Sequence, residues 1–284
     1  MLFDKVAMAA IGNLIAGSLP DAERERETGL PDLPESCISA ILSFTTPRDI
    51  CRLSVVSKLF KSVAYSDFLW NKFLPKECSQ IVSRAGLPIS TSKRELYARL
   101  VNSILIDGGT KMAWLERSTA KMGYMLSARD LNIIWGGDER FWRFVPGDGH
   151  DSRFQVLAEL SKVWWLEVQG QIDCRLLSPN TNYRVVFALK FGERPYGWEV
   201  PIKFSVTTPD GEPAELEECL NERRGESQGT NGGWMGVVGG EFTARPTADD
   251  DDDSHIEFDM KEVAVLFSKG GLLLDGVRIQ PKET

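Results

Sequence analysis

The sequence has little of what most catalytic and metal sites are made from. It contains only two histidines and five cysteines, and no Cys-X-X-Cys pair occurs. A zinc site needs three or four such ligands at short spacing, and a Ser-His-Asp triad needs a histidine with identifiable partners. His150 stands beside a glycine-rich loop and His255 follows a run of aspartates, so we expect both to be loop residues. The sequence therefore predicts no metal and no cofactor.

Enzyme motifs are also missing. The Gly-X-Ser-X-Gly elbow is absent, and the glycine-rich stretch 225–240 lacks the lysine that ends a phosphate loop. The acidic run Asp249–Asp253 does not interleave its carboxylates with a turn-forming glycine, as a calcium loop would, and reads as a solvated acidic loop. A hydrolase would need a cleft with paired carboxylates, and no partner for Glu167 can be identified. We therefore predict a protein that is not an enzyme.

Positive charge is scarce. The formal net charge is -8 and no basic stripe occurs, which argues against a nucleic-acid partner. The odd number of cysteines and the absence of an Asn-X-Ser/Thr sequon favour a reducing compartment. The apolar run 6–17 is interrupted by Asn13 and is shorter than the roughly 20 residues that span a bilayer. We expect neither a signal peptide nor a membrane partner.

The residues that are present divide into a helical part and a β-rich part. Ile38, Ile41 and Leu42 have helical spacing. Thr46 and Pro47 predict a helix start, after which an apolar stripe runs to Val63. Three or four short helices bury little apolar surface alone, which implies a partner. The alternative is a helical subdomain whose apolar side chains pack only on their own chain.

The segment 30–76 resembles the F-box motif. The residues that carry the resemblance are Leu33-Pro34-Glu35, Ile41-Leu42, Pro47-Arg48-Asp49, Val56-Ser57-Lys58, Phe60 and Asp67-X-Leu69-Trp70. The resemblance implies docking on the Skp-family adaptor of an SCF ubiquitin ligase, and through it on the cullin core. The adaptor-binding residues that it implies are Leu33, Pro34, Ile38, Leu42, Val56 and Trp70.

Residues 121–284 predict an antiparallel β-sandwich, jelly-roll-like, behind a connector at 77–120. Apolar and polar residues alternate at 183–190, 202–207 and 256–260, and turn signals separate these segments. Val163–Val168 is almost wholly apolar, as in a strand at the centre of a sandwich. In the connector, Ser92 and Glu95 form a capping box, and a first strand with a buried Trp114 is expected at 112–115.

The β-rich part resembles the phloem protein 2 domain, in the B-type subgroup of F-box lectins related to Nictaba. The matching blocks are Met125–Leu131, Ile134-Trp135, Phe141-Trp142-Arg143, Val163–Gly170, Leu177–Tyr183, Gly233-Trp234-Met235 and Gly271–Ile279. The resemblance implies binding of N-acetylglucosamine oligomers and of the N-glycan core on the sandwich.

Trp135 and Trp142 match two tryptophans that form the sugar platform in these lectins, with their spacing of seven preserved. Indole faces suit sugars, because pyranose C–H groups are apolar and weakly positive. The alternative is that both are core tryptophans, since tryptophan is highly buried on average. His255 stands where the lectins have a sugar-binding carboxylate, and an imidazole is the weaker acceptor. We therefore predict a carbohydrate site of Trp135, Trp142 and His255 with weak or altered specificity.

The sequence thus predicts an α+β multidomain protein: an N-terminal extension at 1–29, an F-box at 30–76, the connector at 77–120 and a lectin-like sandwich at 121–284. The predicted function is substrate recognition for an SCF-type ubiquitin ligase, with a glycoprotein or protein target. The alternative is a nucleocytoplasmic lectin without a ligase role. Both interpretations place the chain in the nucleus and cytoplasm.

Overall fold

The computed structural model describes residues 33–211, 213–223, 233–246, 254–265 and 267–282. The chain divides into two compact units, Met1–Ala64 and Tyr65–Thr284, and each is described by itself. The N-terminal extension, the run Asp249–Asp253 and the first half of the glycine-rich stretch 225–240 lie outside the described residues. Within the described part, no helix is long and apolar enough to cross a membrane.

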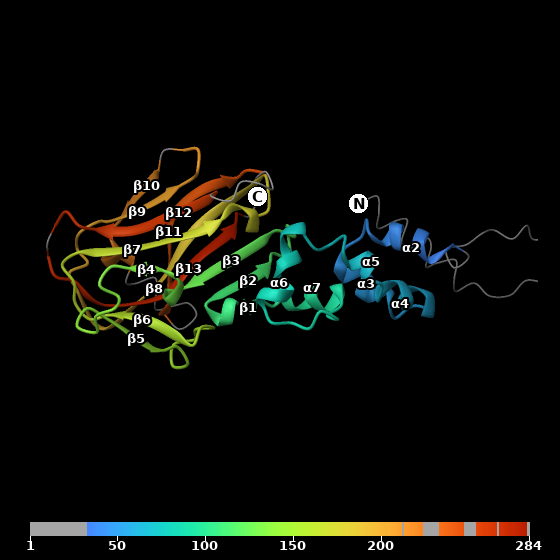
Figure 1. The fold of residues 1–284 in the computed structure, drawn as a ribbon, viewed down its shortest axis with the longest axis horizontal. Coiled ribbons are helices and arrows are strands. Elements are labelled where there is room, and N and C mark those ends of the chain that lie inside the picture. The colour runs from blue at the N-terminus through green and yellow to red at the C-terminus, as the bar shows by residue number, and fades with distance from the viewer. Residues whose placement is uncertain (1–32, 212, 224–232, 247–253, 266, 283–284) are drawn as a thin grey trace, which may run out of the picture. The chain divides into compact units, whose positions relative to one another are not determined.

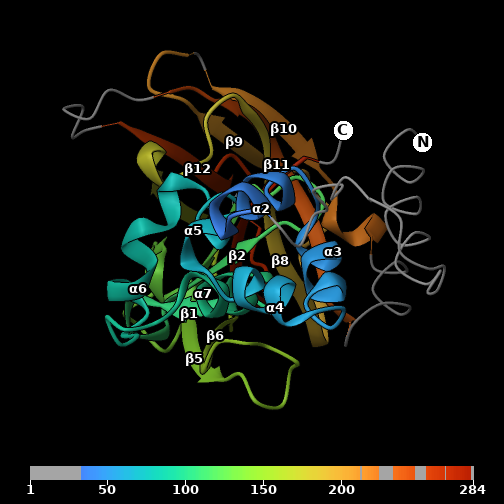
Figure 2. The same cartoon turned by 90° about the vertical axis from the view of Figure 1, so that its right-hand side faces the viewer.

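From residue 33 on, where it is described, the first unit contains three short helices, α2 (Glu35–Leu42), α3 (Pro47–Leu53) and α4 (Lys58–Ala64). Thr46 caps α3 as predicted, because its hydroxyl accepts a hydrogen bond from the Asp49 amide at 3.2 Å. Helix α4 packs against both α2 and α3, which Figure 2 shows gathered together. The apolar stripe that begins at Ile50 does not form one helix, because a turn separates α3 from α4.

The second unit begins with the helices α5 (Asp67–Trp70), α6 (Ile81–Arg84) and α7 (Lys93–Val101). The Ser92 hydroxyl caps α7 by accepting a hydrogen bond from the Glu95 amide, as predicted. Leu96 and Leu100 are buried, and α7 packs on β2, beside which it lies in Figures 1 and 2. The connector helix is therefore part of the core of this unit.

The β domain is a sandwich of two antiparallel sheets, seen as two layers in Figure 1. The eight-stranded sheet contains β1 (Ile104–Ile106), β2 (Lys111–Leu115), β3 (Met122–Ser127), β5 (Trp142–Pro146), β6 (Val156–Leu160), β8 (Thr181–Tyr196), β11 (Met235–Ala244) and β13 (Gly270–Pro281). The five-stranded sheet follows the order β10 (Ala214–Glu218), β9 (Ile202–Thr207), β12 (His255–Glu262), β7 (Leu166–Asp173) and β4 (Asn132–Ile133). The predicted α+β class with an antiparallel sandwich is confirmed.

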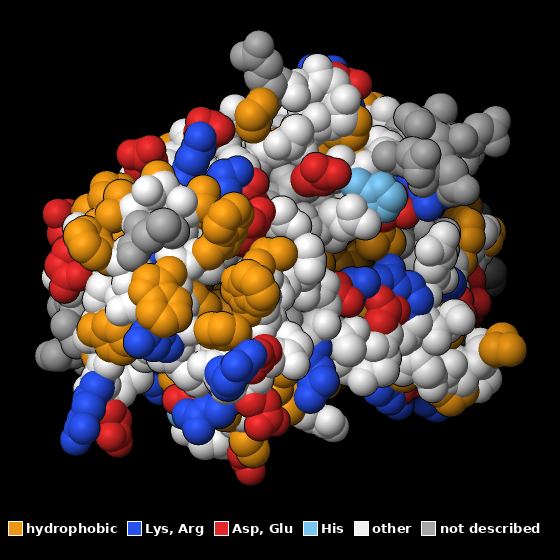
Figure 3. Space-filling view, turned by 60° about the vertical axis from the view of Figure 1, so that its left-hand side comes forward, with side chains coloured by type: hydrophobic (Ala, Val, Ile, Leu, Met, Phe, Trp, Pro, Cys, Tyr) orange, Lys and Arg blue, Asp and Glu red, His pale blue; other side chains and the backbone are white. Residues whose placement is uncertain are grey.

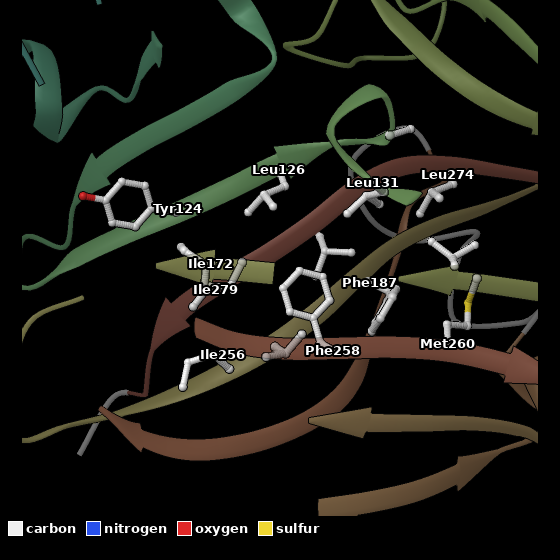
Figure 4. Close-up of a cluster of buried hydrophobic side chains, with 14 of the residues drawn as sticks. Tyr124, Leu126, Leu131, Ile172, Phe187, Ile256, Phe258, Met260, Leu274 and Ile279 are labelled. Carbon is white, nitrogen blue, oxygen red and sulfur yellow. The ribbon is translucent and has the colours of Figure 1, made fainter. Parts of the chain in front are cut away.

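The core lies between the two sheets (Figure 4). In β12, Ile256, Phe258 and Met260 point inward and are buried, as their alternation with polar residues predicts. Phe258 meets Phe187 of β8 edge to face, with ring centroids 6.2 Å apart. Gly170 of β7 lies directly against the Phe258 ring, so a side chain at this position would overlap it.

Three predicted features differ from the structure. Strand β7 begins at Leu166, so Trp164 and Trp165 lie in a bend, and not in a central strand. The strand at 111–115 is the second strand, because β1 precedes it. Trp114 is only partly buried, since its indole covers Gly123 on the neighbouring strand and not the space between the sheets.

Candidate functional site

Large apolar side chains are exposed on loops at one end of the β domain. Trp135 is 55% exposed, and Trp164 and Trp165 are 46% exposed each. Val265 and Phe267 are exposed on the segment between β12 and β13. Figure 3 shows a face of the molecule on which hydrophobic side chains gather beside Lys and Arg side chains. Exposed apolar side chains in one region are typical of an interaction site.

Hydrogen bonds tie these loops to one another. The Ile134 amide donates to the Glu167 carbonyl at 3.0 Å, and the Ser161 amide donates to the Phe141 carbonyl at 2.8 Å. Val163 and Lys269 exchange two main-chain hydrogen bonds of 2.9 and 2.8 Å. The exposed aromatics therefore stand on a connected framework.

Glu167 stands at the centre of a polar network beside the tryptophans. Its carboxylate accepts hydrogen bonds from the Trp165 indole N–H and from the Gln169 amide, both at 2.8 Å. Gln169 in turn accepts a hydrogen bond from Asn132 at 2.8 Å. A row of amides and a carboxylate next to indole faces can hold hydroxyl groups while an apolar sugar face stacks on a ring. We name Trp135, Trp165, Glu167, Gln169 and Asn132 the aromatic site.

Trp135 has an unusual backbone conformation. Its φ is 68°, a left-handed conformation that is costly for a bulky residue. Its ring contacts Phe141, with centroids 5.7 Å apart. Strained residues occur preferentially at functional positions, which supports a role for this exposed indole.

Trp142 is a core residue, which corrects the predicted pair of platform tryptophans. Its side chain is 1% exposed at the start of β5 and belongs to the main apolar cluster. It leaves no indole face on which a sugar could stack. Of the two tryptophans only Trp135 is exposed, and the other exposed indole that is bonded to the Glu167 network is that of Trp165.

His255 is separated from Trp135 by the length of β7. It is the first residue of β12, not a loop residue, and pairs with Asp173, six residues along β7 from Glu167. At about 3.3 Å per residue this separation is about 20 Å. The structure therefore does not bring the three predicted carbohydrate residues into one site.

A cavity of about 480 Å³ contains His255, with Arg84, Lys111, Tyr124 and Asp130 among its other lining residues. The two cationic side chains named here, those of Arg84 and Lys111, are already paired with carboxylates. Arg84 donates hydrogen bonds of 2.9 and 2.7 Å to Asp107 and holds the pKa of that carboxyl below its usual range. Lys111 lies 3.3 Å from Asp130, whose pKa is raised by burial. Burial also raises the pKa of Tyr124, whose hydroxyl has no hydrogen-bond partner among the described residues.

The helical unit also exposes apolar side chains. Ile41, Phe44, Val55 and Val56 are exposed, and we name these four side chains the helical apolar surface. Pro34, which precedes α2, is also exposed, and Leu33 is half-buried.

Three of the residues assigned to adaptor binding are buried instead. Ile38 and Leu42 belong to the interior of the helical unit. Trp70 is buried in the second unit, where its ring lies 5.1 Å from that of Tyr97. Buried side chains of this kind support the fold rather than form a contact surface. Adaptor binding by Leu33, Pro34 and Val56 stays a prediction.

Comparison with known families matches both parts of the chain. A family model for phloem protein 2 matches residues 121–281, and one described as F-box-like matches residues 30–76. The first match covers more than half of the sequence. The chain belongs to the phloem protein 2 family.

Curated relatives share both the family and the arrangement. F-box protein PP2-B15 of Arabidopsis thaliana is 36% identical over 281 residues, covering 88% of this chain and 96% of the relative. F-box protein PP2-B10 of the same plant is 37% identical, covering 87% and 92%. F-box protein PP2-A13, also from this plant, is 30% identical, covering 96% and 97%. An F-box-like module joined to a phloem protein 2 domain supports a role as an F-box adaptor.

The similarity to solved structures is low. A carbohydrate-binding module in complex with β-1,4-galactotriose is 11% identical, covers 54% of this chain and 87% of its own, and gives a TM-score of 0.30. A similarity this low does not indicate what the phloem protein 2 domain of this chain binds.

The sequence reasoning missed Trp165, Glu167 and Gln169 as members of one site. The signal was present in the alternation of β7, in which Glu167 and Gln169 fall on the outward face of the phloem protein 2 domain. It was hidden because Trp164 and Trp165 made the segment resemble a fully buried strand.

Proposed function

We propose that the chain is the substrate-recognition subunit of an SCF-type ubiquitin ligase. Its F-box-like module docks on a Skp-family adaptor, and its phloem protein 2 domain holds the target. The observation that carries the proposal is the helical apolar surface. Ile38 and Ile50 already fill the interior of this small unit, while Phe44 and Val55 are 86% and 85% exposed. Apolar side chains left outside the core of a small module favour a protein partner.

The experiment is co-purification with a Skp-family adaptor. Val55→Asp with Val56→Asp places two carboxylates on the helical apolar surface, and burying them in an apolar interface is costly. Both positions are exposed, so we expect the substitutions to change the free energy of unfolding by less than about 0.5 kcal/mol each. The matched control is Ile89→Asp, an exposed apolar position outside residues 30–76. Undiminished co-purification of the double variant would contradict the proposal.

Target recognition is proposed to use the aromatic site. Trp135 and Trp165 offer exposed indole faces, and Glu167 offers a carboxylate already held in place by two hydrogen bonds. N-acetylglucosamine oligomers fit this chemistry, since they combine apolar ring faces with hydroxyl and amide groups. The glycan is thus one way in which a glycoprotein target is held.

Calorimetry with chitin oligomers and an N-glycan panel tests this part. We expect Trp135→Ala and Trp165→Ala to weaken binding at least about tenfold, the loss that follows when one well-placed stacking contact is removed. The control is Phe68→Ala, which removes an exposed ring from a helix of the same unit. If the intact chain bound no glycan, target recognition would be assigned to protein contacts.

A lectin without a ligase role is the second candidate, favoured by the aromatic site alone. Failure of the intact chain to co-elute with a Skp-family adaptor would select it. For both candidates we propose residence in the nucleus and cytoplasm, and all five cysteines of the chain are free thiols. Cell fractionation is the measurement, and recovery in secretory membranes would contradict this location.

A further inference from the structure

A buried ion pair is bonded to the loops that carry the exposed side chains of Trp164, Trp165, Val265 and Phe267, which we call the aromatic loops. Lys269 is 0% exposed and Glu262 is 6% exposed, and Lys269 Nζ lies 2.6 Å from Glu262 Oε2. Removing two charges from water is costly, and their attraction offsets that cost only with additional hydrogen bonds. A pair of apolar residues would often stabilise such a position equally well. A contribution to stability therefore does not by itself explain why these two positions hold a charged pair.

The remaining hydrogen bonds of the pair go to the backbone of the aromatic loops. Besides Glu262, Lys269 Nζ donates to the main-chain carbonyls of Phe267, at 3.0 Å, and Trp164, at 3.3 Å. The other oxygen of Glu262 accepts a hydrogen bond of 2.7 Å from the Val265 amide. The ammonium thus uses its three donors, and its two main-chain bonds reach Phe267 and Trp164, whose apolar side chains are exposed.

These bonds account for the bend before β7. The carbonyl of Trp164 faces the buried ammonium, while Val163 is paired with the main chain of Lys269. The chain therefore enters β7 only at Leu166, and both tryptophan side chains remain exposed. From the bend, the Trp165 indole donates its hydrogen bond to Glu167 of the aromatic site.

We propose that Lys269 and Glu262 are positioning residues for the aromatic site. They do not touch the ligand, because both are buried. They hold the Trp164–Trp165 bend so that the Trp165 indole stands beside Glu167 before a ligand arrives, which lowers the ordering cost of binding. The inference rests on the proposed glycan recognition by this site.

The decisive variant replaces the pair by Lys269→Met with Glu262→Met. Apolar residues of similar volume keep the interior filled, so we expect the midpoint of thermal unfolding to be unchanged or raised. The loop carbonyls lose their cation, and we expect affinity for chitotriose to fall at least about tenfold. The matched control is Arg184→Met with Glu241→Met, an exposed pair 2.9 Å apart that joins β8 to β11. This control variant should change neither the midpoint of thermal unfolding nor the affinity for chitotriose.

A second readout does not need a ligand. The chain has eight tryptophans, which 5-fluorotryptophan labelling reports individually by fluorine NMR. Resonances of Trp164 and Trp165, assigned by Trp→Phe substitution, should shift or broaden in the Met-Met variant. Those of Trp114 on β2 and of the buried Trp142 should not. A role in stability alone would lower the unfolding midpoint and leave the folded-state resonances in place.

Should the Met-Met variant fail to fold, Lys269→Gln with Glu262→Gln takes its place. Its amides can still donate to a loop carbonyl, so a smaller loss of affinity and smaller shifts are expected. Unchanged affinity together with unchanged Trp164 and Trp165 resonances, in whichever variant folds, would overturn the inference. Absence of glycan binding by the intact chain would overturn the proposed glycan recognition instead. The fluorine spectra would then still decide whether the pair positions the tryptophans.

Discussion

Single tryptophans in this chain have opposite roles that residue type alone does not distinguish. Trp135 is exposed in a strained conformation, whereas Trp142, seven residues later, fills the core. Trp165 is exposed because the buried Lys269 ammonium donates a hydrogen bond to the Trp164 carbonyl and so holds the Trp164–Trp165 bend. At this scale, function follows from the surroundings of each indole.

Trp142→Ala should therefore unfold the β domain rather than abolish sugar binding selectively. Truncating a buried tryptophan leaves a cavity, and we expect a loss of about 3–5 kcal/mol in the free energy of unfolding. Urea denaturation measures it, with Trp164→Ala as the exposed control. A Trp142→Ala variant as stable as the intact chain would contradict the placement of this residue in the core.

Individual strands and helices of the second unit are joined by close contacts, and disturbing such a contact should lower the free energy of unfolding. Gly170 brings β7 against the Phe258 ring of β12. Arg84 of α6 pairs with Asp107, next to β1, and so ties a connector helix to the sheet. Both contacts lie where two elements approach closely.

Gly170→Ala tests the first of these contacts. The added methyl group would overlap the Phe258 ring, and overpacking of this kind costs about 1–3 kcal/mol. Thermal and urea unfolding measure the change. The control is Gly137→Ala, since a methyl group there meets nothing within 4 Å. Equal stability of the two variants would show that the ring moves aside without cost.

Asp107→Asn tests the second contact through its pH dependence. The Arg84 guanidinium lowers the pKa of Asp107, so the ionised form stabilises the folded state. This stabilisation is complete above the ordinary carboxyl pKa of about 3.9 and is lost as the pH falls through the lower folded-state value. We expect the intact chain to be more stable than the variant at pH 7.

The measurement is urea denaturation of both proteins between about pH 2 and 7, the range that spans the ordinary carboxyl pKa. The difference in unfolding free energy should narrow below about pH 4, where Asp107 in the unfolded chain begins to take up its proton while Asp107 in the folded state stays ionised to lower pH. A difference that stays constant down to the lowest pH would contradict the assigned direction of the shift.

At the scale of the whole molecule, the two proposed interactions belong to separate compact units. The helical apolar surface lies within Met1–Ala64 and the aromatic site within Tyr65–Thr284. Each unit has its own buried side chains. The proposed adaptor binding and target binding should therefore be separable by mutation.

Leu33→Ala with Pro34→Ala tests this separation. We expect the double variant to lose co-purification with a Skp-family adaptor, because it truncates an exposed and a half-buried side chain at the start of α2. The thermal unfolding midpoint of the β domain and its glycan affinity should be unchanged. Loss of the β-domain transition in this variant would show that the units do not fold independently.

Local sequence patterns determined much of this protein. The caps at Thr46 and Ser92 and the alternation in β12 were predictable, because each depends on residues that are neighbours along one element. The motifs of the F-box-like module and the phloem protein 2 domain were readable for the same reason. The order of the two parts followed directly from the chain.

Only the tertiary structure decided which residues form the candidate site. Trp142 and His255 were assigned to it by their place in a motif, yet burial removes the first and the length of β7 separates the second. Trp165 joins it because Lys269, more than a hundred residues later in the chain, reaches the carbonyl of Trp164. Packing between distant segments sets exposure and distance, and no local pattern encodes it.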